Sequence, residues 1–138
     1  MSDGFLIDTC AAIWLTQKAP FAEEARFALR LAWRDGTPVF VSPVTAWEMG
    51  MLVARGRISE TKTALKWYQD FLLESRVAER DVTAEIFVAS SFLPQLQHKD
   101  PIDRILIATA REHDLTIVTR DRAILAYGAA GHVKVMAC

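Results

Sequence analysis

Short apolar runs alternate with helix-like segments along the whole chain, and this alternation limits the possible folds more than any other feature. Between the runs, apolar residues recur three or four positions apart, as in Phe27 and Leu31. The alternation predicts βαβ units, and hence an α/β fold in which a parallel sheet carries helices on both faces. The strand-sized runs, mostly β-branched or aromatic, are residues 5–7, 39–41, 76–78, 116–118 and 133–136.

Length and composition indicate one globular domain spanning residues 1–138. The chain is 51% hydrophobic, and no repeat, low-complexity segment or long linker divides it. Charged residues make up 24% of the chain and the net charge is −1. Because these numbers predict no broad basic surface, nucleic acid would have to be held by local contacts.

The cysteines and the apolar runs favour a reducing, cytoplasmic environment. Cys10 and Cys138 show neither metal-ligand spacing nor a disulfide framework, so we expect inert or buried thiols. No apolar run approaches the ~20 residues of a membrane span. The first residues also lack the form of a signal peptide. We therefore expect a soluble, cytoplasmic protein with no membrane partner.

Two aspartates follow strand-sized runs. Asp8 comes directly after residues 5–7, and Asp121 comes shortly after residues 116–118. Each could simply cap the next helix, because aspartate is a preferred N-cap residue. In a parallel sheet, however, both would stand at the carboxyl ends of strands, where open α/β sheets bind their ligands. Both are therefore candidate site residues.

Glu48 lies on the apolar side of a predicted helix that begins near Pro43. It shares a stripe with Val44 and Met51 by three-and-four spacing. A buried, unpaired glutamate is costly, so the side chain should have a partner. An ion pair with an arginine and a bound metal ion both satisfy this requirement.

The segment "HKDPIDRILIATA", residues 98–110, contains two aspartates with different expected roles. Asp100 is the predicted N-cap, with Pro101 at the first helical position. Asp103 then falls in the first turn, where a capping-box variant would explain it. It also shares its face with Leu106, whereas Arg104 is expected on a different, exposed face. We therefore expect Asp103 to point inward.

Four acids from separate segments could thus meet at one edge of the sheet. Such a cluster is unfavourable without a cation, because like charges repel. Carboxylates without histidine or cysteine companions select Mg²⁺ or Mn²⁺, ions that suit phosphoryl chemistry. A metal-dependent phosphodiesterase follows as a hypothesis, with the candidate ligands Asp8, Glu48, Asp103 and Asp121.

Four segments in this order resemble the PIN-domain ribonucleases, and among them the VapC-type toxins of bacterial toxin–antitoxin pairs. They are "LIDTCAAIWL" (residues 6–15), "VSPVTAWEMGMLVARGRI" (41–58), "HKDPIDRILIATA" (98–110) and "LTIVTRDRAILAYG" (115–128). Their order and spacing extend over nearly the whole chain, from residue 6 to residue 128. Two departures are Ile102, where phenylalanine is common, and Cys10, where histidine or serine is frequent; neither removes a ligand.

The resemblance implies a three-layer PIN-like fold and an endoribonuclease that uses one or two Mg²⁺ or Mn²⁺ ions. It assigns metal binding to Asp8, Asp103 and Asp121, and implies that Glu48 orients a water or adds a ligand. Cleavage would leave a 5′-phosphate and a 3′-hydroxyl. It further implies a homodimer and silencing by a cognate VapB-type antitoxin. Exposed apolar side chains of residues 47–58 and 61–71 are the expected contact surfaces.

Supporting roles are predicted for residues next to the acids. Thr9 and Thr119 could hydrogen-bond the metal ligands, or serve as ordinary turn and strand-end threonines. Basic residues beside the acidic segments could contact RNA phosphates, although surface charge also explains each. Histidines 98, 113 and 132 are expected at the surface or as caps, and the tryptophans in packing. The basic candidates are Lys99, Arg104, Arg120 and Arg122.

Two other classes of protein remain as alternatives. A phosphotransfer receiver domain is also α/β with acids at strand ends, but it needs an aspartate after the middle strand and a lysine after the last. Residues 76–80 and Lys134 supply neither convincingly. A non-catalytic α/β binding module would use the acids only as helix caps. A dinucleotide-binding fold is disfavoured because no Gly-x-Gly-x-x-Gly follows the first run.

Overall fold

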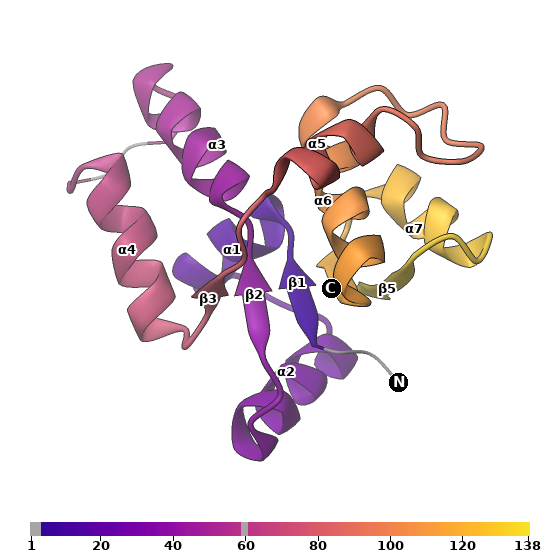
Figure 1. Cartoon of the computed structure of the whole chain (residues 1–138). Coiled ribbons are helices and arrows are strands. Elements are labelled where there is room, and N and C mark those ends of the chain that lie inside the picture. The colour runs from indigo at the N-terminus through magenta and orange to yellow at the C-terminus, as the bar shows by residue number, and fades with distance from the viewer. Residues whose placement is uncertain (1–3, 59–60) are drawn as a thin grey trace.

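A five-stranded parallel sheet forms the centre of the computed structural model, which describes residues 4–58 and 61–138 (Figure 1). The strands lie in the order β3-β2-β1-β4-β5, and each neighbouring pair is parallel. The predicted α/β class with a parallel sheet is confirmed. The strands are β1 (Phe5–Ile7), β2 (Val39–Val41), β3 (Ala78–Glu79), β4 (Thr116–Thr119) and β5 (Lys134–Ala137).

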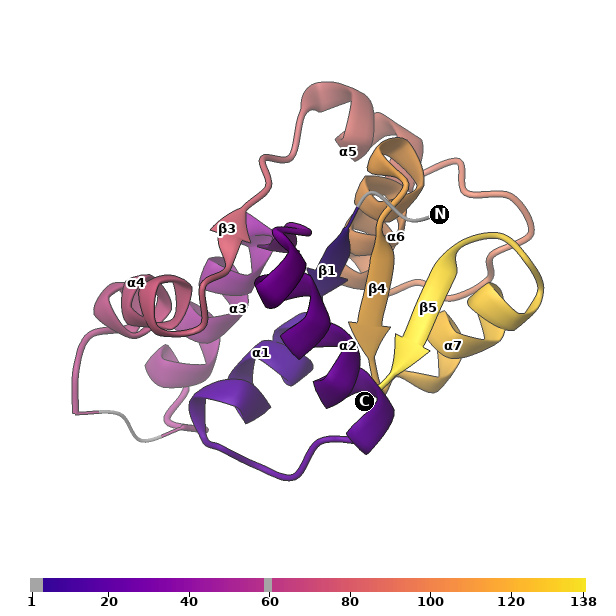
Figure 2. The same ribbon diagram turned by 90° about the horizontal axis from the view of Figure 1, so that it is seen from below.

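Helices cover both faces of this sheet, as Figures 1 and 2 show from two directions. α1, α2 and α4 pack on one face, and α5, α6 and α7 on the other, while α3 contributes to both cores. The three layers agree with the predicted architecture. The helices are α1 (Thr9–Thr16), α2 (Glu23–Asp35), α3 (Pro43–Ala54), α4 (Ala64–Glu74), α5 (Ala84–Ser90), α6 (Pro101–His113) and α7 (Arg122–Ala129).

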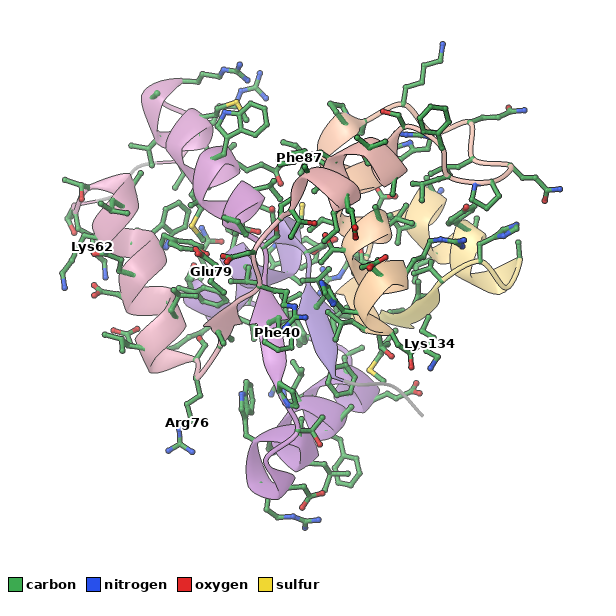
Figure 3. The ribbon with its side chains drawn as sticks, viewed as in Figure 1. Phe40, Lys62, Arg76, Glu79, Phe87 and Lys134 are labelled. Atoms are coloured by element: carbon green, nitrogen blue, oxygen red, sulfur yellow. The ribbon has the colours of Figure 1, made fainter. Side chains whose placement is uncertain are left out.

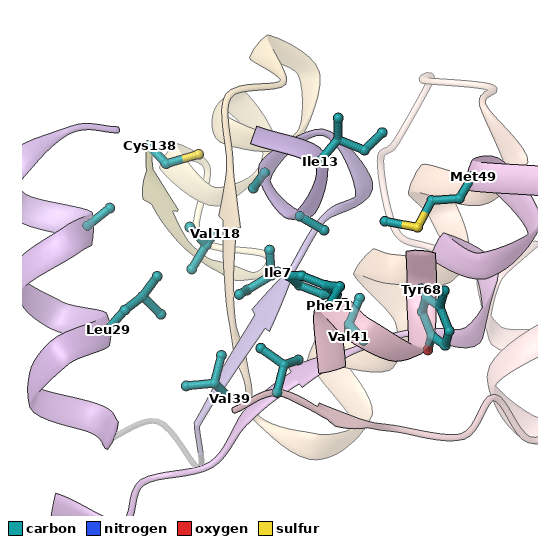
Figure 4. Packing of buried hydrophobic residues seen from close by; sticks show 14 of the residues in the cluster. Ile7, Ile13, Leu29, Val39, Val41, Met49, Tyr68, Phe71, Val118 and Cys138 are labelled. Atoms are coloured by element: carbon teal, nitrogen blue, oxygen red, sulfur yellow. The ribbon is translucent and has the colours of Figure 1, made fainter. Parts of the chain in front are cut away.

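Side chains that alternate along the strands divide the core into two layers. Leu6 of β1 faces the α5–α7 layer together with its register partner Ile117 of β4. The next residues along these strands, Ile7 and Val118, face the opposite layer and pack near Leu29 of α2 (Figure 4). Because every second residue is apolar on each side, a strand that is buried on both faces reads as a continuous apolar run.

One local prediction was wrong. Residues 76–78 do not form a strand as a unit: Arg76 adopts a left-handed φ of 53°, and the Val77 N–H bonds the Leu72 carbonyl, which closes the end of α4. Arg76 therefore points outward (Figure 3), and β3 begins at Ala78. In α2, Phe27 is 57% exposed, because the buried stripe consists of the smaller Ala25, Ala32 and Leu29.

The sheet has a topological switch point between β1 and β4. The chain proceeds from β1 through β2 to β3 on one side, whereas β4 and β5 lie on the other. In open α/β sheets, the crevice at the carboxyl ends of such strands is the usual ligand site. Asp8 follows β1 and Asp121 follows β4, so both stand at this crevice.

Among the described helices, none is both long enough and apolar enough to cross a membrane.

Candidate metal centre

A cavity of about 320 Å³ opens at the carboxyl ends of β1 and β4. All four predicted acids line it, although they come from the starts of α1, α6 and α7 and from the middle of α3. The fold therefore brings the predicted set together. The lining residues are Asp8, Thr9, Cys10, Trp14, Glu48, Asp100, Asp103, Arg120 and Asp121.

Asp8 is the most buried of the four acids, with 5% of its surface exposed. It caps α1, because its Oδ1 accepts a hydrogen bond from the Ala11 N–H at 2.8 Å. Its Oδ2 accepts a second hydrogen bond from the Thr119 hydroxyl. Both carboxylate oxygens keep a further lone pair, so Asp8 serves as a cap and can still bind a cation.

Thr119 connects the ends of β1 and β4. The side chain is fully buried, and its Oγ1 also accepts a hydrogen bond from the Asp121 N–H at 3.0 Å. Asp121 in turn caps α7 through Oδ1, which accepts from the Ile124 N–H at 2.9 Å. The predicted supporting role of Thr119 therefore has a geometric basis, and Asp121 is held at the same edge as Asp8.

Glu48 enters the cavity from α3 and is half-buried. The fully buried side chains of α3 are those of Thr45 and Met49, so Glu48 lies at the edge of the buried face. The prediction that Glu48 belongs to the apolar face is therefore only partly right. The Thr9 hydroxyl bonds the Glu48 carboxylate and also lies 3.0 Å from the Thr45 hydroxyl. Among the described residues, Glu48 forms no ion pair with an arginine, so this alternative is not supported.

The two aspartates of residues 98–110 both line the cavity, and the predicted cap at Asp100 and inward direction of Asp103 are confirmed. Asp100 caps α6, because its Oδ1 accepts from the Ile102 N–H at 2.9 Å and from the Asp103 N–H at 3.1 Å. Asp103 points to the cavity, and its Oδ2 lies 2.8 Å from Nε2 of His98. His98 was expected only at the surface or as a cap, so its contact with Asp103 was missed.

Burial makes the negative charge of this cluster costly. It raises the pKa of Asp8 from 3.8 to about 6, against the hydrogen bonds from Thr119 and Ala11, which lower it. Burial also raises the pKa values of Glu48 and Asp103, and the neighbouring acids add to each rise. The carboxylates are therefore placed where a bound cation would relieve both burial and repulsion.

Donor atoms suited to a divalent cation lie close together. One ligand atom each from His98, Asp103 and Asp121 can be chosen so that all three are within 4.8 Å of one another. Carboxylate oxygens are the preferred protein ligands of Mg²⁺ and Mn²⁺. The residues at this edge therefore fit a divalent cation.

Arg120 and Trp14 form one wall of the cavity. The Arg120 guanidinium stacks over the Trp14 ring, 3.7 Å from its centroid, and donates to the carbonyls of Pro20 and Cys138. Sequence spacing alone did not identify Trp14 as a wall residue, because the position of its ring depends on the direction in which α1 leaves β1. Cys10 also lines the wall; the residue is exposed, and partial desolvation, together with the nearby acids, raises its thiol pKa to about 11.

Arg104 corrects one prediction. It is half-buried, not on an exposed face, and its guanidinium donates to the carbonyls of Ser90, Leu96 and His98 at 2.7, 3.3 and 2.8 Å. It is also absent from the cavity wall among the described residues. Arg104 therefore fastens the segment before α6, and we do not propose it as a phosphate contact. Arg122 and Lys99 are exposed beside the site.

Comparison with known proteins identifies relatives of the chain. A family model described as "PIN domain" matches residues 5–129. Ribonuclease VapC22 of Mycobacterium tuberculosis is 27% identical over 119 residues, which are 86% of this chain and 88% of that protein.

Two solved structures share the fold. One chain of VapBC2 from Rickettsia felis, bound to a promoter DNA fragment, aligns with a TM-score of 0.71 and 16% identity over 96% of this chain and 97% of its own. One chain of a toxin–antitoxin complex from Klebsiella pneumoniae aligns with a TM-score of 0.55 and 24% identity over 86% and 87%.

Proposed function

Because the chain belongs to the PIN domain family, we propose that it is a metal-dependent endoribonuclease that hydrolyses RNA phosphodiester bonds. The observation that carries this proposal is the convergence of Asp8, Glu48, Asp103 and Asp121 on one cavity at the switch point of the sheet. A helix-capping role accounts for Asp8 and Asp121, but not for Glu48 in the middle of α3. The similarity to Ribonuclease VapC22 supports RNA as the substrate.

Asp103, Asp121 and Asp8 would hold one or two Mg²⁺ or Mn²⁺ ions, directly or through water, and Glu48 would orient a water or add a ligand. Such an ion supplies positive charge at the scissile phosphate and lowers the pKa of water. The protein's own contribution is to keep the acids in place: Thr119 orients the Asp8 carboxylate and holds the Asp121 backbone, the Ile124 N–H holds the Asp121 carboxylate, and Thr9 orients Glu48. These hydrogen bonds prevent the carboxylates from turning away from one another.

RNA would approach along the rim of the cavity. Arg120 lies in its wall with Trp14, and Arg122 follows the capping Asp121 on the exposed start of α7. Their positive charges could contact phosphates of an RNA chain that lies next to Asp121. Because the net charge is −1, these local charges would provide most of the electrostatic attraction for RNA.

We also propose that the protein is the toxin of a toxin–antitoxin pair, active as a homodimer and neutralised by a VapB-type antitoxin. The similarity to a VapC ribonuclease supports this role. Large exposed apolar side chains on the two predicted contact segments fit protein interfaces: Trp47 is 55% exposed and Leu65 is 62% exposed. Phe87 of α5, which was not among the predicted contacts, is 49% exposed as well.

The test is cleavage of total RNA by the purified protein in Mg²⁺ or Mn²⁺, compared with EDTA and with the variant Asp8→Asn. We expect cleavage only by the wild type and only with the ion. The toxin role is tested by the growth of bacteria that express either the wild type or Asp8→Asn, since only the wild type should stop growth. Full cleavage activity in Asp8→Asn would disprove the assigned chemistry.

A further inference from the structure

His98 faces two of the acidic residues, although it lies outside any helix or strand. Its Nε2 is 2.8 Å from Asp103 Oδ2, and the three donor atoms of His98, Asp103 and Asp121 lie within 4.8 Å of one another. A metal–ligand distance of about 2.1 Å in octahedral geometry places neighbouring ligands about 3 Å apart and opposite ligands roughly 4 Å apart. The 2.8 Å between His98 and Asp103 matches two neighbouring ligands, and the 4.8 Å limit exceeds the span of opposite ligands only slightly, so small side-chain shifts would bring all three donors onto one ion.

The segment that carries His98 is fastened to the helices that carry the two aspartates. This segment, residues 91–98, runs alongside α6 and α7 in Figures 1 and 2. Arg104 of α6 donates to the carbonyls of Ser90, Leu96 and His98 itself. Tyr127 of α7 donates to the Pro94 carbonyl at 2.6 Å. The imidazole is thus held relative to both Asp103 and Asp121 by bonds that do not involve its ring.

We propose that Nε2 of His98 is a direct ligand of the cation, so that His98, Asp103 and Asp121 form a mixed nitrogen–oxygen site on the α6–α7 side of the cavity. This assignment rests on the proposed function and names one more ligand of the same site. It differs from the carboxylate-only set predicted from the sequence. His98 stands five residues before Asp103, a spacing that no helical or strand periodicity connects to the site.

A nitrogen ligand changes which ion the site prefers. Imidazole binds transition metals such as Mn²⁺ better than Mg²⁺, which favours oxygen ligands and retains its waters. The site should therefore discriminate in favour of Mn²⁺, and this discrimination should depend on His98. A histidine that only hydrogen-bonded and oriented Asp103 would affect both ions equally.

The experiment measures Mn²⁺ and Mg²⁺ binding to the full chain by calorimetry, and ¹⁴N coupling to bound Mn²⁺ by electron spin-echo spectroscopy. The variants are His98→Gln, which keeps a polar side chain, and the control His132→Gln. His132 stacks on Tyr127 with ring centroids 4.5 Å apart and is not part of the donor cluster. Thermal unfolding of each variant confirms that it is folded.

We expect a ¹⁴N signal in the wild type and in His132→Gln, and its loss in His98→Gln. Mn²⁺ affinity should fall about 10- to 100-fold in His98→Gln, while Mg²⁺ affinity changes less than about threefold. A wild-type Mn²⁺ complex without ¹⁴N coupling, an equal loss of both affinities, or no Mn²⁺ binding would overturn the assignment. RNA cleavage is assayed separately: metal-dependent cleavage without ¹⁴N coupling would leave the ribonuclease proposal intact, whereas ¹⁴N coupling without cleavage would reject only that proposal.

Discussion

The Thr119 hydroxyl joins two aspartates that are 113 positions apart in the chain: it donates to Asp8 Oδ2 and accepts from the Asp121 N–H at 3.0 Å. No other fully buried threonine bonds two of the four acids within the described ranges; Thr45 bonds Thr9, and Thr109 bonds the Ile105 carbonyl of its own helix. The backbone pairing of β1 and β4, which includes the Asp8 N–H bonded to the Val118 carbonyl at 3.1 Å, is thus supplemented by one hydroxyl group that fixes the Asp8 carboxylate next to the start of α7.

Replacing Thr119 by valine should destabilise the protein and reduce RNA cleavage. Valine keeps the shape but leaves a buried carboxylate oxygen and a backbone N–H without their partner, at a cost of about 1–3 kcal/mol in the free energy of unfolding. The control is Thr109→Val, which removes only a hydrogen bond to a helical carbonyl that is already bonded. Chemical denaturation and cleavage assays compare the two. Unchanged cleavage in Thr119→Val would contradict the orienting role.

The stability of the metal-free protein should fall as the pH rises from about 4 to 6. The pKa of Asp8 is raised from 3.8 to about 6 in the folded state, chiefly by burial, so the folded protein binds more protons than the unfolded chain in this range. Above the folded pKa, the ionised side chain costs folding on the order of 3 kcal/mol.

The variant Asp8→Asn isolates this effect. It should gain stability relative to the wild type as the pH rises from about 4 to 7, because it has no charge to bury. Urea denaturation at a series of pH values measures the difference, and a divalent cation at pH 7 should stabilise the wild type more than the variant. A difference that does not vary with pH would show that burial of the Asp8 charge has been misjudged.

The neighbouring aspartates Asp103 and Asp100 should respond differently to the same substitution. Asp103→Asn removes the charge of a proposed metal ligand and should lower cleavage at least about 100-fold, roughly the loss that removal of a positioned electrostatic group produces. It should cost little stability, because burial raises the pKa of Asp103 and disfavours its charge. Asp100→Asn should cleave RNA almost normally, because asparagine also caps helices. Equal cleavage by Asp103→Asn and Asp100→Asn would contradict the assignment of Asp103 as a metal ligand and Asp100 as a helix cap.

Arg104 and Arg122 form a second matched pair. Arg104→Lys should lose the three carbonyl contacts that its guanidinium makes, since an ammonium group cannot reproduce them. We expect a loss of about 1–3 kcal/mol in stability and faster proteolysis within residues 91–98. Arg122→Lys, at an exposed position, should change stability by less than about 0.5 kcal/mol. Greater protease resistance in Arg104→Lys than in Arg122→Lys would contradict the fastening role.

The features that were predictable from the sequence are those that depend on neighbouring residues. The apolar run of β1 and the following cap Asp8 are adjacent in the chain, and Asp100 with Pro101 begins α6 by the ordinary preferences of helix starts. The parallel arrangement follows from the alternation of strands and helices. These local rules also placed Asp8 and Asp121 at the same edge of the sheet.

The features that were missed depend on contacts between distant segments or on backbone geometry. The position of His98 is determined by Arg104 and Tyr127, which hold an irregular segment that has no periodicity. Arg76 takes the left-handed conformation that ends α4, so the apparent strand starts two residues later.

The central claim is that the four converging acids make a metal-dependent phosphodiesterase. Its most direct test is the chemical identity of the RNA ends, determined after cleavage of a labelled RNA by the wild type in Mn²⁺, in EDTA and with Asp103→Asn. We predict 5′-phosphate and 3′-hydroxyl ends that form only in the wild type with the ion. Cleavage that persists in EDTA and leaves 2′,3′-cyclic phosphate ends would contradict the account, because those ends arise when the RNA's own 2′-hydroxyl attacks instead of water.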